Sequence, residues 1–209
     1  MMKICISTVI IATFLSCLAV AVPEPAIVQK PGDWTLDVRF ENPQQMVLPG
    51  AVQERFWYII FSLTNKSGKD VDFYPQCDLL TDTLQLVPAV KGTSAILFEK
   101  IKARHQGRYP FLELLENAGE KILQGEDNAK DIVVIWPDFD PNAKSVSFFI
   151  SGLSNETIAI DSPTEKDQDG KPAKVYLRKT LQLTCSIAGD PKFRSDQKLK
   201  FESKRWVMR

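Results

Sequence analysis

Histidine is almost absent from this chain, and its scarcity removes several classes of active site. His105 is the single histidine among 209 residues. The count excludes zinc or copper sites built on several histidines, and a histidine-activated serine or cysteine would have to use His105. This residue falls near the end of a predicted helix beside Arg104 and Arg108, where the helix dipole favours a cation. We therefore expect His105 to be structural.

An excess of charge of one sign is also missing. The 26 Lys and Arg residues face 26 Asp and Glu residues, which gives a formal net charge of +0. Nucleic-acid binding normally needs a clear positive excess, so we expect no nucleic-acid partner. The C-terminal stretch is locally basic, but its cations alternate with apolar residues, and we expect a solvated strand face there rather than an anion-binding patch. These cations are Lys198, Lys200, Lys204, Arg205 and Arg209.

The first 21 residues have the layout of a cleavable secretory signal. Lys3 precedes an apolar run over 4–18, and Ala19-Val20-Ala21 supplies the small-x-small pattern that precedes cleavage before Val22. The run is shorter than the roughly 20 residues that cross a bilayer, and no positive stop follows it. We therefore predict an exported, periplasmic or extracellular protein with no transmembrane span in the mature chain.

Lipid anchoring at Cys17 is the less favoured alternative. Lipoprotein signals usually carry Leu three residues before the cysteine with small residues between, and Phe14 and Leu15 depart from that pattern. After cleavage, we expect a flexible leader over 22–33 and one domain over 34–209.

Cysteine is scarce as well. Cys5 and Cys17 lie in the predicted signal, which leaves Cys77 and Cys185 in the domain. An even pair in an exported protein is a disulfide candidate. The alternative is two buried thiols, since alternation places Cys185 on a core face. Both interpretations stay open at the level of sequence.

Alternation of apolar and polar residues dominates the domain and predicts strands. We expect strands over 34–40 and 56–63, the second apolar on both faces and therefore central, with 56–75 forming a hairpin. Further strands are expected near 132–136, 146–150 and 158–160, then a polar loop over 161–174. A last pair should cover 175–187 and 199–208. Residues 94–105 are rich in helix formers and predict a helical insertion.

Short-range patterns for ligands are weak. Glu165-x-Asp167-x-Asp169-Gly170 and Asp138-x-Asp140-x-Asn142 resemble the start of a calcium loop, but both lack the acidic twelfth ligand, so we expect solvated turns.

Three of the four tryptophans (Trp34, Trp57 and Trp136) fall in core-facing or buried registers, and Trp206 falls on the opposite face of its strand. Core packing is therefore favoured over sugar stacking. No pair of carboxylates stands out for glycoside hydrolysis. Asn65-Lys66-Ser67 and Asn155-Glu156-Thr157 are glycosylation sequons.

The segments 57–60 and 63–68, followed by 125–127, 133–136 and 148–153, resemble the strand and turn signatures of small exported bacterial proteins of planctomycete type. The resemblance covers about residues 34–209 and implies an immunoglobulin-like antiparallel β-sandwich, but it transfers no catalytic or binding residue.

From these observations we expect a mainly β protein without enzymatic activity, cofactor or metal, which binds or scaffolds an unknown protein or other component of the cell envelope. A carbohydrate-binding or enzyme-accessory module is the first alternative and predicts exposed aromatic side chains. A carboxylate-based hydrolase is the second and predicts a cleft with two convergent carboxylates.

Overall fold

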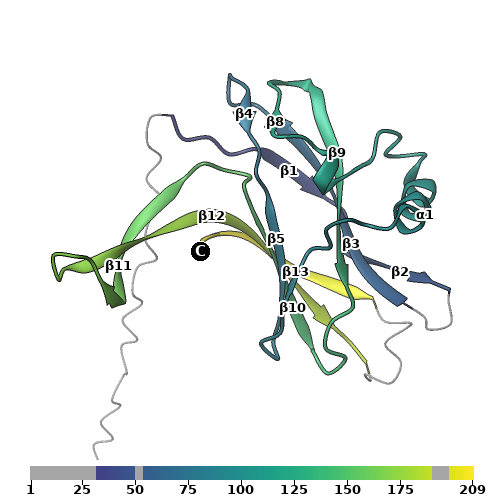
Figure 1. The fold of residues 1–209 in the computed structure, drawn as a ribbon. Coiled ribbons are helices and arrows are strands. Elements are labelled where there is room, and N and C mark those ends of the chain that lie inside the picture. Colours follow the sequence, from purple (N-terminus) through teal and green to yellow (C-terminus); the bar gives the residue numbers. More distant parts are fainter. Residues whose placement is uncertain (1–31, 50–53, 190–197) are drawn as a thin grey trace, which may run out of the picture. The chain divides into compact units, whose positions relative to one another are not determined.

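The computed structural model describes residues 32–49, 54–189 and 198–209. The predicted signal over 1–21 and nearly all of the predicted leader over 22–33 lie outside the described residues. Strands dominate the described part of the chain, which confirms the expectation of a mainly β domain (Figure 1).

The first sheet is built around β3, which has a partner on each edge. β9 pairs with one edge and β1 and β2 with the other, all antiparallel, while β7 adds to β9 in parallel. Side chains on both faces of β3 are buried, as the two-sided apolar pattern predicts. The strands are β1 (Asp37–Phe40), β2 (Gln44–Leu48), β3 (Glu54–Asn65), β7 (Glu113–Leu114) and β9 (Gly125–Pro137).

The second sheet has β10 near its centre, between β5 and β12. β6 pairs with β5, and β12 is long enough to pair with β10, β11 and β13. The strands are β5 (Gln76–Thr81), β6 (Leu86–Pro88), β10 (Ser145–Ser151), β11 (Thr157–Lys166), β12 (Pro172–Ile187) and β13 (Leu199–Met208). A small separate pair is made by β4 (Val71–Asp72) and β8 (Lys121–Ile122), and a 3-10 turn covers Leu115–Asn117.

The main core joins inward side chains of both sheets. Trp57 and Trp136 of the first sheet and Phe148 and Leu183 of the second belong to one buried cluster. The rings of Trp136 and Phe148 meet edge to face, with centroids 4.9 Å apart. Burial of such large apolar side chains is the main favourable contribution to folding.

The helix α1 (Ala95–His105) confirms the prediction over 94–105 and covers the outer face of the first sheet. Leu97 and Ile101 are buried against Tyr58, Ile60 and Val133, which form the second core cluster with neighbouring apolar residues. The two-sided burial of β3 therefore has two causes: the second sheet on one face and α1 on the other.

The predicted hairpin over 56–75 is wrong. The turn after β3 exists, and Asn65 stabilises it by donating from Nδ2 to the carbonyls of Lys69 and Ile122. β3 pairs with β9 instead of the next segment, since Val71 lies opposite Ile122 of β8 and the chain then enters the second sheet at β5. Sequence alternation identified the strands, whereas the pairing depends on segments about 70 residues away.

The predicted polar loop over 161–174 is also wrong. β11 continues to Lys166 and β12 begins at Pro172, so this segment belongs to an antiparallel ribbon that we call the β11–β12 arm (residues 157–178). Figure 1 shows the arm extending beyond the part of the sheet formed by β5 and β10. Both faces of its outer part are exposed, which explains a polar sequence without a strand-like apolar stripe.

Candidate functional site

The two cysteines of the domain lie in the core as free thiols. Cys77 is opposite Ile150 and Cys185 is opposite Val146, so they sit on different strands that flank β10 and are offset by four residues along it. Strand spacings of about 4.8 Å and a rise of about 3.3 Å per residue then separate their Cα atoms by roughly 16 Å. A disulfide needs less than about 7 Å, so this strand order favours two buried thiols. Burial raises the pKa of Cys185 to about 12 and also raises that of Cys77.

His105 ends α1 and belongs to a polar cluster on the helix side of the first sheet. Its Nε2 lies 2.9 Å from the Tyr58 hydroxyl, which also accepts a hydrogen bond from Arg104. Burial, followed by the charge of Arg104, lowers the pKa of His105. The neighbouring Tyr109 hydroxyl donates to Glu41, and burial together with this carboxylate raises the pKa of Tyr109 to about 12.

The weak calcium patterns form local turns. Asp167 accepts hydrogen bonds from the backbone N–H groups of Asp169 and Lys171, which closes the tip of the β11–β12 arm. Asp138 accepts from the Trp57 indole and pairs with Arg55. Within the described ranges, no group of three or more His, Cys, Asp or Glu side chains is placed to hold a metal ion.

Both sequons carry an asparagine whose side chain has a structural contact. Asn65 is fully buried and its amide holds the turn after β3. Asn155 accepts from the backbone N–H of Trp34 and donates to the carbonyl of Gly32, so it fastens the start of the described domain to the β10–β11 connection.

The tryptophans divide into two groups. Trp57 and Trp136 are core residues, whereas Trp34 and Trp206 are half-buried. The ring of Trp206 lies under the ammonium of Lys179, with Nζ 5.3 Å from the ring centroid. The most exposed tyrosines are Tyr74 and Tyr176, at 63% and 70%.

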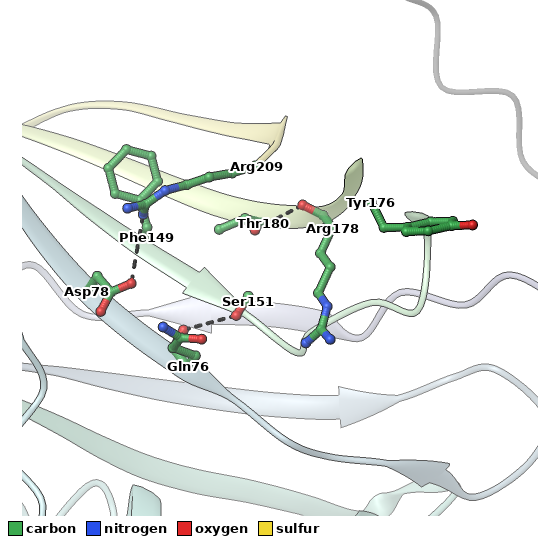
Figure 2. Close-up of a pocket in the computed structure, with 8 residues that line it drawn as sticks. All are labelled: Gln76, Asp78, Phe149, Ser151, Tyr176, Arg178, Thr180 and Arg209. Carbon is green, nitrogen blue, oxygen red and sulfur yellow. Dashed lines mark hydrogen bonds and ion pairs between the residues drawn. The ribbon is translucent and has the colours of Figure 1, made fainter. Parts of the chain in front are cut away.

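A first hollow of about 380 Å³ lies on the outer face of the second sheet, where the sheet meets the β11–β12 arm. Figure 2 shows Arg209 and Phe149 at one end, Tyr176 at the other, and Arg178 between them. The lining residues come from β5, β10, β12 and the end of the chain: Gln76, Asp78, Phe149, Ser151, Tyr176, Arg178, Thr180 and Arg209.

The two arginines of the first hollow differ in their contacts. The Arg209 guanidinium stacks on Phe149, with its carbon 4.3 Å from the ring centroid, and lies 3.9 Å from the Asp78 carboxylate. Arg178 holds Arg209 by two backbone hydrogen bonds. Within the described part of the chain, the exposed Arg178 guanidinium has no ion-pair or hydrogen-bond partner.

A second hollow of about 480 Å³ shares Arg178 with the first. Trp34 and Tyr74 give it two aromatic side chains, while Asp70 and Asp72 give it two carboxylates. Asp70 accepts from the backbone N–H of Gln124, and the Asp72 carboxylate lies 3.9 Å from Lys121. The remaining lining residues are Lys69, Val71, Gly152, Ser154, Asn155 and Thr157. We call the two hollows together the arm groove.

Sequence reasoning missed the residues at the centre of the arm groove. Tyr176, Arg178 and Thr180 alternate with Val175, Leu177 and Lys179, so period two places the first set on one face. The alternation is visible in the sequence. Because the polarity of 161–174 predicts a loop, however, the sequence does not predict that this strand extends into an arm. Of the predicted basic stretch, Arg209 reaches the groove, whereas Arg205 donates to Gln182 and Lys200 pairs with Glu202.

The described residues form a mainly β domain with an open polar groove, which runs from the outer face of the second sheet to the β4 segment. The chain matches no protein-family model, and no curated protein or solved structure is significantly similar to it. In the part of the chain that the structure describes, no helix is long and apolar enough to cross a membrane.

Proposed function

We propose that this chain is an exported, non-enzymatic binding protein of immunoglobulin-like β-sandwich type, which holds a polar component of the cell envelope in the arm groove. The observation that carries the proposal is the meeting of two hollows at Arg178, with exposed aromatic rings and hydrogen-bonding groups around it. Ligand sites commonly combine apolar surface with a few convergent polar groups in this way.

Two further features support parts of this proposal. Export is supported by the signal-like pattern of residues 1–21. The immunoglobulin-like class is supported by two mostly antiparallel sheets that share one core. The likeness to exported planctomycete-type proteins rests on the strand and turn signatures of the sequence alone. Export predicts a mature N-terminus at Val22, and N-terminal sequencing of protein from the envelope fraction tests it.

A saccharide is the ligand class that the groove favours among envelope components. Tyr74 and Tyr176 offer aromatic faces on which sugar rings can stack, and Trp34 adds a half-buried ring. This arrangement brings the binding proposal together with the carbohydrate-binding alternative, which predicts exposed aromatic side chains.

The test is co-sedimentation of purified protein with insoluble envelope polysaccharide. We expect Tyr74→Ala and Tyr176→Ala together to abolish sedimentation. Phe111→Ala is the matched control, because Phe111 is 85% exposed and lies outside the lining of the groove. An equal loss of sedimentation in Phe111→Ala, or sedimentation retained by the double variant of Tyr74 and Tyr176, would contradict the proposed site.

The carboxylate-based hydrolase is the second candidate because Asp70 and Asp72 both line the second hollow. Glycoside hydrolysis uses two carboxylates across the scissile bond. Incubation with the bound polysaccharide separates the two functions. A binding protein releases no new reducing ends, whereas release that disappears in Asp70→Asn or Asp72→Asn would favour the hydrolase.

A further inference from the structure

We infer that the polysaccharide of the arm groove is acidic, and that Arg178 binds a sugar carboxylate. This inference rests on the proposed function and adds the charge of the ligand and the residue that recognises it. Arg178 is the natural anchor because it lines both hollows and is therefore within reach of a ligand that spans them.

The place of the groove on the sheet favours a saccharide over a peptide strand. Peptides that add to a sheet bind its edge, where backbone N–H and C=O groups are unpaired. The first hollow lies over β5, β10 and β12, and β10 is paired along both edges. Recognition at this face must therefore use side chains, which suits a ligand that presents hydroxyl and carboxylate groups.

The charges of the first hollow leave one cation available. Arg209 is held by Phe149 and by Asp78, whose side chain is only 15% exposed. Asp78 therefore offsets the charge of Arg209 and keeps it in place. Arg178, which lacks such a partner among the described residues, can give a carboxylate two parallel hydrogen bonds.

The two hydroxyl groups beside Arg178 donate their protons within the protein. Ser151 donates its proton to the carbonyl of Gln76, and Thr180 donates to the carbonyl of Arg178 (Figure 2). The Ser151 oxygen retains lone pairs that can accept a hydrogen bond from a sugar hydroxyl, whereas Thr180 is 3% exposed and forms the floor of the hollow. The exposed ring of Tyr176 follows at the end of the hollow, where a neighbouring sugar ring can stack on it.

The experiment compares oligogalacturonate with the same oligosaccharide after methyl esterification, which keeps the sugar and removes the carboxylate charge. Calorimetry on the full mature protein measures both affinities at low and moderate salt. We expect the ester to bind at least tenfold more weakly. We expect Arg178→Gln to weaken oligogalacturonate binding to the level of the ester. Arg178→Lys should have intermediate affinity, because an ammonium keeps the charge but cannot give one carboxylate two parallel hydrogen bonds.

Lys102→Gln is the charge-matched control, because Lys102 lies on α1 outside the groove. Galacturonic acid monomer and a tetrapeptide with a free C-terminal carboxylate serve as competitors. Full competition by the monomer would show that an isolated carboxylate suffices, and full competition by the peptide would replace the saccharide with a peptide; either overturns the inference.

The remaining outcomes separate this inference from the function on which it rests. Equal binding of acid and ester, or unchanged binding by Arg178→Gln, overturns the role of charge and leaves a neutral saccharide as the ligand. Failure of both oligosaccharides, together with failure to sediment with envelope polysaccharide, overturns both proposals.

Discussion

Lys179 donates a hydrogen bond from Nζ to the Glu156 carboxylate, and the two side chains are only 9% and 4% exposed. The ammonium also reaches Thr35 Oγ1 at 3.0 Å, so the pair ties β12 both to the start of β11 and to the segment before β1. A buried ion pair requires the removal of both charges from water, and its net stabilisation is therefore small even when its geometry is good.

Removal of one partner should be far more damaging than removal of both. Lys179→Met leaves the Glu156 carboxylate buried without its counter-charge, and we expect a loss of about 3–5 kcal/mol in the free energy of unfolding. The double variant Glu156→Leu with Lys179→Met should recover most of this loss. Urea denaturation at pH 7 measures both. A double variant no more stable than Lys179→Met would contradict this account.

The thiols of Cys77 and Cys185 should be reduced and unreactive in the native protein. Burial raises the pKa of both thiols, so little thiolate is present at neutral pH. We expect N-ethylmaleimide to label neither peptide in native protein and both after unfolding in urea without reductant. Peptide mass mapping reads each site separately. Label that appears only after reduction would establish a disulfide and require a different strand order.

The strands and the helix were predictable because their signals are local. Trp57, Ile59 and Phe61 alternate within β3, and helix formers fill α1, so neighbouring residues alone favour these elements. The two-sided apolar pattern of β3 also predicted its central position. None of these signals contains the identity of a pairing partner, and the hairpin expected over 56–75 is wrong for that reason.

The groove was harder to predict because it depends on the arm. The outer part of the arm is exposed to solvent on both faces, so its sequence has the polarity of a loop, although antiparallel backbone pairing of β11 with β12 makes it a ribbon. Gln76, Ser151 and Arg178 come together only through the pairing of β10 with β5 and β12 and of β12 with β11. Their proximity is a property of topology, not of any segment.

Gly152 should be the least replaceable glycine near the groove. Its φ is +82°, and a Cβ atom there would lie 2.6 Å from the Tyr74 carbonyl oxygen. Gly152→Ala therefore combines backbone strain with a steric clash, and we expect a loss of about 2–5 kcal/mol in unfolding free energy.

Gly170→Ala is the matched control for this prediction. Gly170 has a similar φ of +75°, but a Cβ atom would have nothing within 4 Å. Gly170→Ala should therefore lose only about 1–2 kcal/mol of unfolding free energy, from backbone strain alone. Thermal and urea denaturation of the two variants compare the losses directly, and equal losses would show that the contact with Tyr74 is unimportant.

His105 should make the protein less stable as the pH falls. Burial and the charge of Arg104 lower its pKa in the folded state, with Glu41 acting in the opposite direction and Arg108 adding to the decrease. The unfolded chain, with a pKa near 6.5, therefore binds the proton more readily than the folded chain. The stability that the neutral ring provides is present above about pH 6.5 and is lost as the pH falls through that value toward the lower pKa of the folded state. Unfolding free energies of wild type and His105→Gln between pH 5 and pH 8 isolate this contribution, because the carboxylates titrate in both proteins.

We expect the wild type to lose stability relative to His105→Gln below about pH 6.5. Parallel curves would mean that His105 takes up a proton equally well in both states, and a relative gain in acid would mean that Glu41 outweighs burial.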